Sequence, residues 1–322
     1  MMKKTATNFP TDSDALFLTD GGLETTLIFQ EGFDLPCFAA FDLLQTEKGY
    51  LALQNYYRRY LEVAKKHHTS FILETPTWRA NPDWIEKTGH PANAVSAVNT
   101  RAVDLLKDLK SEFEKDLPTI LISGCIGPRG DGYFPENLMS CEEAQQYHST
   151  QIEVLHHASV DLISALTINN AEEATGITRA ANHFQVPAVI SFTVETDGKL
   201  PTGMSLKEAI KSVDDHTEIP PLYFMINCAH PKHFHDELFK HKNEPWIHRI
   251  KAIRANASCK SHSELDHATT LDRGIPKELG QEYKKLKETF GHLNVFGGCC
   301  GTDEEHISEI ILQTSAVSSS KA

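Results

Sequence analysis

The feature that most constrains the fold of this chain is a regular alternation of short apolar runs with longer amphipathic segments. The apolar runs recur roughly every 30 to 45 residues, which is typical of strands that are each followed by a helix. The expected strands span residues 16–19, 71–75, 119–123, 162–167, 188–194, 222–227, 250–255 and 293–296. The expected helices span residues 48–67, 92–114, 142–158, 171–184, 206–213 and 277–289. Capping boxes, in which Ser or Thr precedes Glu by three residues, predict helix starts at Ser140, Ser205 and Thr302.

Eight strand–helix units in about 300 residues predict an α/β fold, a single (β/α)8 barrel of the TIM type. An open, doubly wound sheet is the alternative, because periodicity alone does not distinguish the two. Polar residues and cysteines follow the expected strands at their carboxyl ends, where barrel enzymes assemble their active sites. These residues are Asp20, Glu74, Cys125, Thr167, Glu195, Cys228, Asn256 and Cys299. Their placement favours the barrel.

The domain organisation follows from size and composition. A length of 322 residues and a hydrophobic content of 40% allow one large core. No shift in composition indicates a second domain, so we expect the barrel to span residues 15–314. We expect residues 1–14 and 315–322 to be disordered, as chain ends commonly are.

Charge and cysteine usage narrow the class of protein. With 44 acidic against 31 basic side chains, the formal charge is -13, which disfavours a nucleic-acid-binding surface. The amino-terminal residues lack the apolar core of a signal peptide, and no apolar run is long enough to span a membrane. Seven cysteines is an odd number, and they are spread along a long chain, which argues against a disulfide framework. We therefore expect a cytoplasmic protein with reduced thiols.

Residues 294–302 end an apolar run with two glycines, two adjacent cysteines and a third glycine. In a regular strand the side chains of Cys299 and Cys300 would point to opposite faces, so their sulfurs reach one point only if the backbone bends. We expect the three glycines, Gly297, Gly298 and Gly301, to permit that bend. Cys228 ends a second apolar run, two strands earlier.

Three thiolates at strand ends, without an evident fourth, are the ligands that an open zinc site requires. A substrate thiol entering the fourth position would lose its proton and become a nucleophile, which suits methyl transfer to sulfur. Two other interpretations remain: a vicinal disulfide between Cys299 and Cys300, and cysteines that serve only as small buried hydrophobic residues.

At these motifs the sequence resembles the homocysteine S-methyltransferase family, from about Leu16 to Ile311. The most specific matches are residues 297–302 and 226–228, which resemble the two zinc-ligand motifs of the family in order and separation. Supporting matches are residues 19–25, 74–78, 124–130, 191–194 and 197–198.

The resemblance implies a barrel, one Zn²⁺ and methyl transfer to the sulfur of homocysteine, giving methionine. It implies Cys228, Cys299 and Cys300 as zinc ligands. It also implies a substrate-binding set of Asp20, Gly21, Gly22, Glu24, Glu74, Thr75 and Asn227, in which carboxylates hold the ammonium group and backbone amides hold the carboxylate. The methyl donor would be S-methylmethionine, S-adenosylmethionine or a betaine-like compound. A methyl-cobalt donor would have to come from a partner protein.

The sequence departs from the family pattern at Leu166, where many relatives have a glutamate that binds the amino group of homocysteine. No carboxylate follows until Glu172, and Pro76 stands where relatives often have asparagine. These changes leave the zinc chemistry untouched but bear on the acceptor. Two alternatives therefore stay open: a non-catalytic barrel that binds zinc and thiols, and the same chemistry on another thiol or a selenol.

Overall fold

Eight parallel strands form a closed barrel in this computed structural model, which describes residues 8–136, 138–266 and 268–319. The strands are β1 (Phe17–Leu18), β2 (Ser70–Glu74), β3 (Ile120–Ile126), β4 (Leu162–Ile168), β5 (Ala188–Phe192), β6 (Tyr223–Asn227), β7 (Ile250–Ala255) and β8 (Val295–Gly298). β1 pairs with both β2 and β8, which closes the ring and excludes the open sheet. The predicted (β/α)8 barrel is confirmed, and each expected strand overlaps an observed one.

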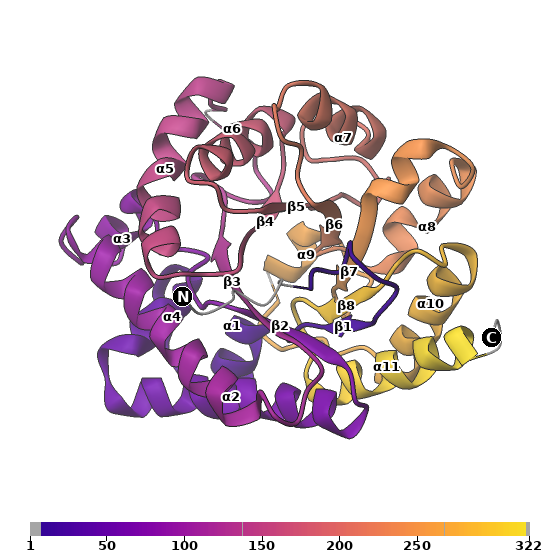
Figure 1. The fold of residues 1–322 in the computed structure, drawn as a ribbon, viewed down its shortest axis with the longest axis horizontal. Helices are drawn as coiled ribbons and strands as arrows, with labels where there is room; N and C mark the ends of the chain where they lie inside the picture. The colour runs from indigo at the N-terminus through magenta and orange to yellow at the C-terminus, as the bar shows by residue number, and fades with distance from the viewer. Residues whose placement is uncertain (1–7, 137, 267, 320–322) are drawn as a thin grey trace, which may run out of the picture.

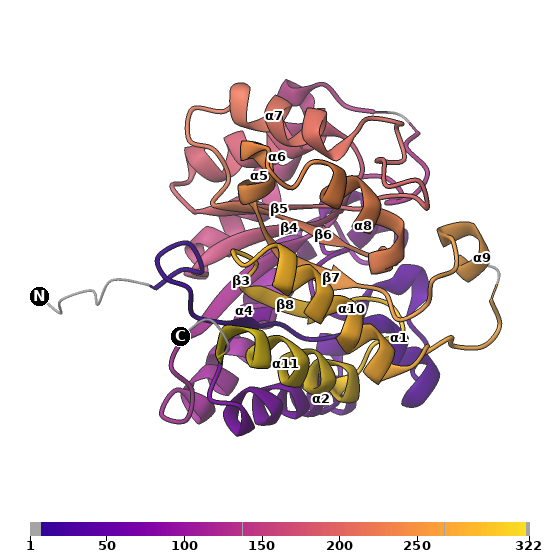
Figure 2. The same cartoon turned by 90° about the vertical axis from the view of Figure 1, so that its right-hand side faces the viewer.

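Helices surround the barrel wall (Figure 1). The long ones are α2 (Glu47–Lys66), α4 (Ala94–Phe113), α5 (Cys141–His157), α6 (Ala171–His183), α7 (Leu206–Asp215), α8 (Pro231–Lys240), α10 (Pro276–Thr289) and α11 (Glu304–Ser319). Short helices α1 (Leu23–Thr25), α3 (Pro82–Lys87) and α9 (His262–Asp266) lie in the loops. Figure 2 shows α1 and α9 at the same end of the barrel, the end at which the functional residues gather.

Side chains alternate between two cores, as the pleat of a strand requires. In β1, Phe17 packs inside the barrel, whereas Leu18 packs against the surrounding helices. The apolar interior consists of Phe17, Ile72, Leu121, Cys125, Leu162, Leu166, Val189, Tyr223, Met225, Ala252 and Val295. Inward positions closer to the carboxyl ends carry polar residues instead, such as Glu74 and Arg254. The barrel interior is therefore apolar near the amino ends of the strands and charged near their carboxyl ends.

Two of the three expected capping boxes are confirmed. The hydroxyls of Ser140 and Ser205 accept bonds from the third residue of their helices, and the glutamates there complete both boxes. The box at Thr302 is wrong, because its hydroxyl donates to the Cys299 carbonyl oxygen, 2.7 Å away. α11 begins one residue later than that box requires, and the Asp303–His306 pair lies at its start.

Residues near the start of the described chain contact the barrel. The Asn294 side chain donates to the carbonyl oxygens of Pro10 (2.8 Å) and Ser13 (3.1 Å). α11 continues to Ser319, within the segment expected to be a disordered tail. Residues 1–7 and 320–322, the rest of the expected disordered ends, lie outside the described residues. No helix within the described ranges is both long and apolar enough to cross a membrane.

Candidate metal centre

Three cysteine sulfurs from two strand ends lie together at the mouth of the barrel. Cys228 follows β6, and Cys299 and Cys300 follow β8. The Cys228 Sγ lies 2.8 Å from the Cys299 Sγ and 3.6 Å from the Cys300 Sγ, and all three sulfurs lie within 4.8 Å of one another. All three are free thiols, so the vicinal disulfide is not formed. Across the described ranges, no other three His, Cys, Asp or Glu side chains come close enough to hold a metal ion.

The end of β7 holds both cysteine loops in place, because β7 lies between β6 and β8. The Cys228 N–H donates to a β7 carbonyl oxygen at 3.1 Å, and the Cys299 N–H donates to the Ala255 carbonyl oxygen at 2.8 Å. Just beyond β7, the Ala257 N–H donates to the Cys300 carbonyl oxygen at 3.0 Å. The sulfurs are thus positioned by backbone bonds to one shared strand.

The backbone bends differently from the expectation. Gly301 has a φ of 80° and Cys228 a φ of 57°, so both adopt the left-handed region. Gly297 and Gly298 do not have positive φ. They are needed for space, because a Cβ on Gly297 would overlap the Thr19 hydroxyl and one on Gly298 would overlap a second threonine hydroxyl. The expectation that all three glycines supply the bend is therefore right for Gly301 alone.

Asn227 joins three strand ends beneath the cysteines. Its Oδ1 accepts from the Thr167 N–H (2.9 Å) and the Ser191 hydroxyl (2.6 Å), and its Nδ2 donates to the Thr167 hydroxyl (2.9 Å). Thr167 has a φ of 61°, which is uncommon for a β-branched residue. Asn227 therefore lines the cavity and fixes the β4 end beside the metal centre.

Tyr133 and His262 reach Cys228 from loops that sequence reasoning did not single out. The Tyr133 hydroxyl lies 3.0 Å from the Cys228 Sγ, and the His262 Nε2 lies 2.6 Å from the Cys228 carbonyl oxygen. The two rings lie against each other at a tilt of 35°, with centroids 4.1 Å apart, and Glu195 lies 3.1 Å from the other His262 ring nitrogen. The position of Tyr133, just after the glycine-rich loop that follows β3, was the one available sequence signal.

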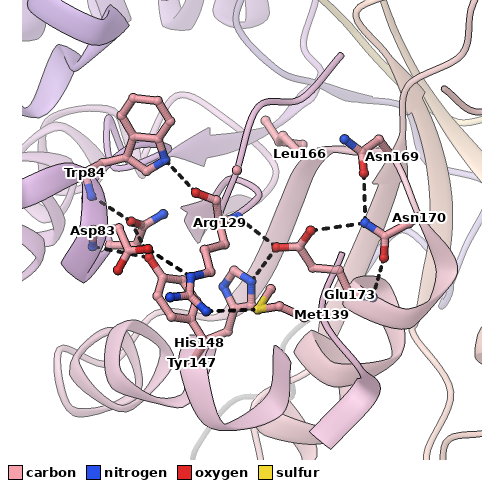
Figure 3. Close-up of polar contacts among 12 residues, drawn as sticks. Asp83, Trp84, Arg129, Met139, Tyr147, His148, Leu166, Asn169, Asn170 and Glu173 are labelled. Atoms are coloured by element: carbon pink, nitrogen blue, oxygen red, sulfur yellow. Dashed lines mark hydrogen bonds and ion pairs between the residues drawn. The ribbon is translucent and has the colours of Figure 1, made fainter. Parts of the chain in front are cut away.

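A buried hydrogen-bond network around Glu173 supports the loop that carries Tyr133 (Figure 3). The Glu173 carboxylate accepts from the Arg129 backbone N–H at 2.8 Å and lies 2.9 Å from the His148 Nε2. Burial raises the pKa of Glu173, but the bonds from His148, Arg129 and Asn170 outweigh it and hold that pKa below its usual range. The loop is therefore anchored by an ionised carboxylate.

Arg254, which sequence reasoning also missed, occupies the centre of the barrel mouth. Its Nη2 lies 2.6 Å from the Asp20 carboxylate, its Nη1 lies 3.8 Å from the Glu74 carboxylate, and its Nε donates to the Gly298 carbonyl oxygen at 3.1 Å. The Tyr56 hydroxyl donates to the other Asp20 oxygen at 3.0 Å. Burial lowers the pKa of Arg254, but the two carboxylates outweigh it and raise that pKa above its ordinary value. Asp20 and Glu74, both expected to bind the substrate, thus lie beside the buried cation Arg254.

The cysteines open into a cavity of about 630 Å³, whose wall includes all seven residues of the expected substrate-binding set: Asp20, Gly21, Gly22, Glu24, Glu74, Thr75 and Asn227. Glu24 differs from Asp20 and Glu74 because no side chain of the described residues bonds or pairs with it. Burial raises the pKa of Glu24 to about 7, and burial also raises that of Glu74 to about 7. Glu24 is therefore the carboxylate with the most capacity for a ligand.

Other members of the expected set already have partners. The Gly22 N–H donates to the Thr302 carbonyl oxygen at 3.0 Å, and the Thr75 hydroxyl accepts from the Cys125 N–H at 2.9 Å. Leu166 packs in the apolar interior, and its carbonyl oxygen accepts from the Trp78 indole N–H at 3.1 Å. The wall beside Leu166 is therefore apolar.

Comparison with known proteins gives a consistent result. The family model described as homocysteine S-methyltransferase matches residues 17–313. Homocysteine S-methyltransferase 1 of Arabidopsis thaliana is 23% identical over 326 residues, covering 91% of both chains. Homocysteine S-methyltransferase YbgG of Bacillus subtilis is 28% identical over 273 residues, covering 77% of this chain and 82% of YbgG.

Solved structures show the same fold. The oxidized form of the homocysteine methyltransferase MmuM from Escherichia coli superposes with a TM-score of 0.76 at 18% identity, covering 95% of this chain and 100% of that one. The metallated form of MmuM superposes with a TM-score of 0.72, also at 18% identity, covering 94% and 96% of the two chains.

Proposed function

Because this chain belongs to the homocysteine S-methyltransferase family, we propose that it transfers a methyl group from an activated small-molecule donor to the thiol of homocysteine, giving methionine. The observation that carries the proposal is the convergence of three free cysteine sulfurs within 4.8 Å at the mouth of a large cavity. Family membership supplies the reaction type, and the cysteines supply the means of activating a thiol.

The cysteine cluster fits Zn²⁺. Three thiolates are ligands that zinc prefers, and tetrahedral Zn–S bonds of about 2.3 Å separate neighbouring sulfurs by about 3.8 Å. The Cys228–Cys300 separation of 3.6 Å is close to that value, whereas the Cys228–Cys299 pair at 2.8 Å would have to widen. No fourth protein ligand meets the cluster in the described chain, which leaves room for a substrate sulfur. We assign Cys228, Cys299 and Cys300 as the zinc ligands.

The chemistry that zinc would supply is a lowered pKa for a thiol bound in its fourth position, which creates a nucleophile at neutral pH. The protein residues hold that thiol in place and keep the cysteine loops rigid. In the transfer, a lone pair of the acceptor sulfur forms the new S–C bond. The bond between the methyl carbon and the donor sulfur or nitrogen breaks, its electron pair stays with the leaving group, and the thiol proton passes to solvent. Placing both reactants in one cavity supplies much of the rate.

We assign Glu24 as the partner of the acceptor ammonium group. Asp20 and Glu74 lie beside Arg254, so their charges are compensated within the protein. Glu24 lines the same cavity and has no side-chain partner among the described residues. Glu24 would take the place of the carboxylate that is absent at position 166, because an ammonium group can be held from the opposite side of the barrel mouth. Thr75 and Asn227 shape the wall through their own hydrogen bonds.

One observation favours a second candidate, the same chemistry on another thiol or a selenol. Leu166 makes the wall apolar where many relatives have a glutamate, so an acceptor without an amino group would fit there. A non-catalytic thiol-binding barrel would show the same zinc ligation without turnover.

The test is a methionine-formation assay on zinc-loaded protein, with homocysteine and each of S-methylmethionine, S-adenosylmethionine and glycine betaine. We expect turnover with at least one donor. Turnover with other thiols but not with homocysteine would reassign the acceptor. X-ray absorption can show whether homocysteine sulfur binds zinc directly. Such ligation without turnover of any thiol would indicate the non-catalytic thiol-binding barrel.

A further inference from the structure

A second buried arginine lines the cavity, and its surroundings differ from those of Arg254. Arg79 lies between β2 and α3, and only 6% of its surface is exposed. Its guanidinium carbon lies 4.0 Å from the ring centroid of Trp78 and 3.7 Å from that of Trp84. Two indole rings therefore hold the charged group in a fixed plane.

The tryptophans are themselves fixed. The Trp84 indole N–H donates to the Arg129 carbonyl oxygen at 2.9 Å (Figure 3). The Trp78 indole N–H donates to the Leu166 carbonyl oxygen at 3.1 Å. Neither ring can turn without losing a hydrogen bond, so the guanidinium is preorganised before any ligand arrives.

The Arg79 guanidinium has unused donors. A guanidinium carries five N–H donors. In the described chain, Arg79 makes one side-chain hydrogen bond, from Nη1 to the Gly130 carbonyl oxygen at 2.9 Å, and its buried Nε has no partner. No described carboxylate lies within ion-pair distance of it, whereas Arg254 contacts Asp20 at 2.6 Å. A buried cation without an anion is costly unless a ligand provides one.

The guanidinium remains charged in this setting. Burial lowers the pKa of Arg79 to about 10, with Asp131 acting in the opposite direction, so the group is protonated at neutral pH. A planar guanidinium matches the geometry of a carboxylate. The same cavity wall also carries Asp131, whose charge favours a ligand that has a cationic centre as well as a carboxylate.

These observations point to a zwitterionic ligand. We infer that Arg79 is the residue that binds the carboxylate of the methyl donor. This inference rests on the proposed methyl transfer. It makes discrimination against onium ions that lack an anionic group, such as trimethylsulfonium, depend on this one side chain.

The test compares two donors, each with its carboxamide: S-methylmethionine and glycine betaine. Removing a hydrogen-bonded charge partner costs on the order of 10- to 100-fold in affinity. For the wild-type enzyme we therefore expect kcat/KM for the carboxylate of the active pair to exceed that for its amide by about that factor. Arg79→Gln should raise KM for the carboxylate by about 10- to 100-fold and change that for the amide less than about three-fold. KM for homocysteine and the zinc content should stay unchanged.

Arg101→Gln is the matched control, because that arginine also lies over an aromatic ring, Tyr50, but stands outside the cavity on α4. It should leave both donors unaffected. Arg79→Lys keeps the charge without the planar fork and should give an intermediate KM. Equal losses for carboxylate and amide in a folded Arg79 variant would show a structural role and overturn the inference. So would an unchanged KM, or wild-type enzyme that does not distinguish the pair.

A binding measurement separates this inference from the proposed reaction. Two of the three tryptophans of the chain flank Arg79. Titrating wild-type protein with S-methylmethionine or glycine betaine should change tryptophan fluorescence at concentrations at least about ten-fold lower than those their amides require. If the fluorescence responds but no donor turns over, the reaction fails and the carboxylate site stands. A response to inorganic phosphate and not to either carboxylate would overturn the assignment.

Discussion

At the residue scale, each cysteine of the proposed centre contributes one ligand and has no substitute nearby. Cys228→Ser should reduce zinc from about one equivalent to less than about a tenth in protein dialysed against a weak chelator, because hydroxyl oxygen is a poor zinc ligand. Metal content by mass spectrometry gives the measurement. Cys259→Ser, at an exposed position, is the control and should retain full zinc. Undiminished zinc in the Cys228 variant would contradict the assignment.

Glu24 provides the second prediction at this scale. Glu24→Gln should raise KM for homocysteine by about 10- to 100-fold, because a charge-assisted bond to the ammonium group is lost. Steady-state kinetics with saturating donor measures the change. Glu172→Gln is the matched control: this carboxylate is exposed at the start of α6, and its loss should have no effect. A raised KM in the Glu172 variant with an unchanged KM in the Glu24 variant would instead place the ammonium site at the β4 side of the cavity.

His292 gives a pH dependence at a site remote from the metal centre, just before β8. Burial lowers the pKa of His292 to about 4, and the nearby His248 acts in the same direction. The unfolded chain, with an ordinary histidine pKa of about 6.5, therefore takes up the proton first as pH falls. The stability contribution is present above about pH 6.5 and is lost towards pH 4; the expected loss is about 1–2 kcal/mol for this partly exposed ring. Urea denaturation should show a smaller loss over that pH range in His292→Gln.

At the element scale, strand ends could be predicted because two patterns agree. Each apolar run is followed by a polar residue or cysteine, and the carboxyl ends of parallel strands meet at one rim. The contacts made by the loops were harder to predict from the sequence. α9 brings His262 to Cys228, and the loop after β3 brings Tyr133 there, through contacts 34 and 95 residues apart in the sequence. Local pattern carries little information about such contacts.

Asn227 couples β4, β5 and β6, so its loss should act on the whole rim. Asn227→Ala would leave the Thr167 N–H and the Ser191 hydroxyl without their acceptor in a buried setting. We expect the free energy of unfolding to fall by about 2–4 kcal/mol and zinc affinity to fall with it. Urea denaturation and a chelator competition measure the two effects. Asn243→Ala, at an exposed position, should change stability by less than about 0.5 kcal/mol.

At the scale of the whole molecule, the charged network at the mouth helps to join the first and last parts of the chain. Arg254 in β7 meets Asp20, which follows β1, across 234 residues of sequence. β1 has only two residues, so few ladder bonds hold it between β2 and β8. The side-chain network adds contacts where the sheet itself is shortest.

Arg254→Gln should therefore destabilise the barrel strongly. It would leave the buried Asp20 and Glu74 carboxylates without their cation, a change that costs about 3–5 kcal/mol. Thermal denaturation followed by circular dichroism should show a clear fall in Tm. Arg58→Gln, which removes an exposed ion pair with Glu112, is the control and should change stability by no more than about 1 kcal/mol. Equal Tm values for the two variants would contradict this role.

The network also shows where sequence reasoning stopped. The (β/α)8 fold and the convergence of the three cysteines could be predicted, because both follow from strand order. Arg254 could not, because a single arginine inside an apolar run indicates nothing until its distant partners are known. Only its position carried information: it stands two residues after the inward-facing Ala252 and therefore also faces inward from β7.

The tight contact between Gly297 and Thr19 restricts how this lineage can diverge. Any larger residue at 297 would displace Thr19, which directly follows β1, so such a change requires a smaller residue at position 19. A mutational library that varies both positions together should recover active combinations that single replacements at 297 never yield.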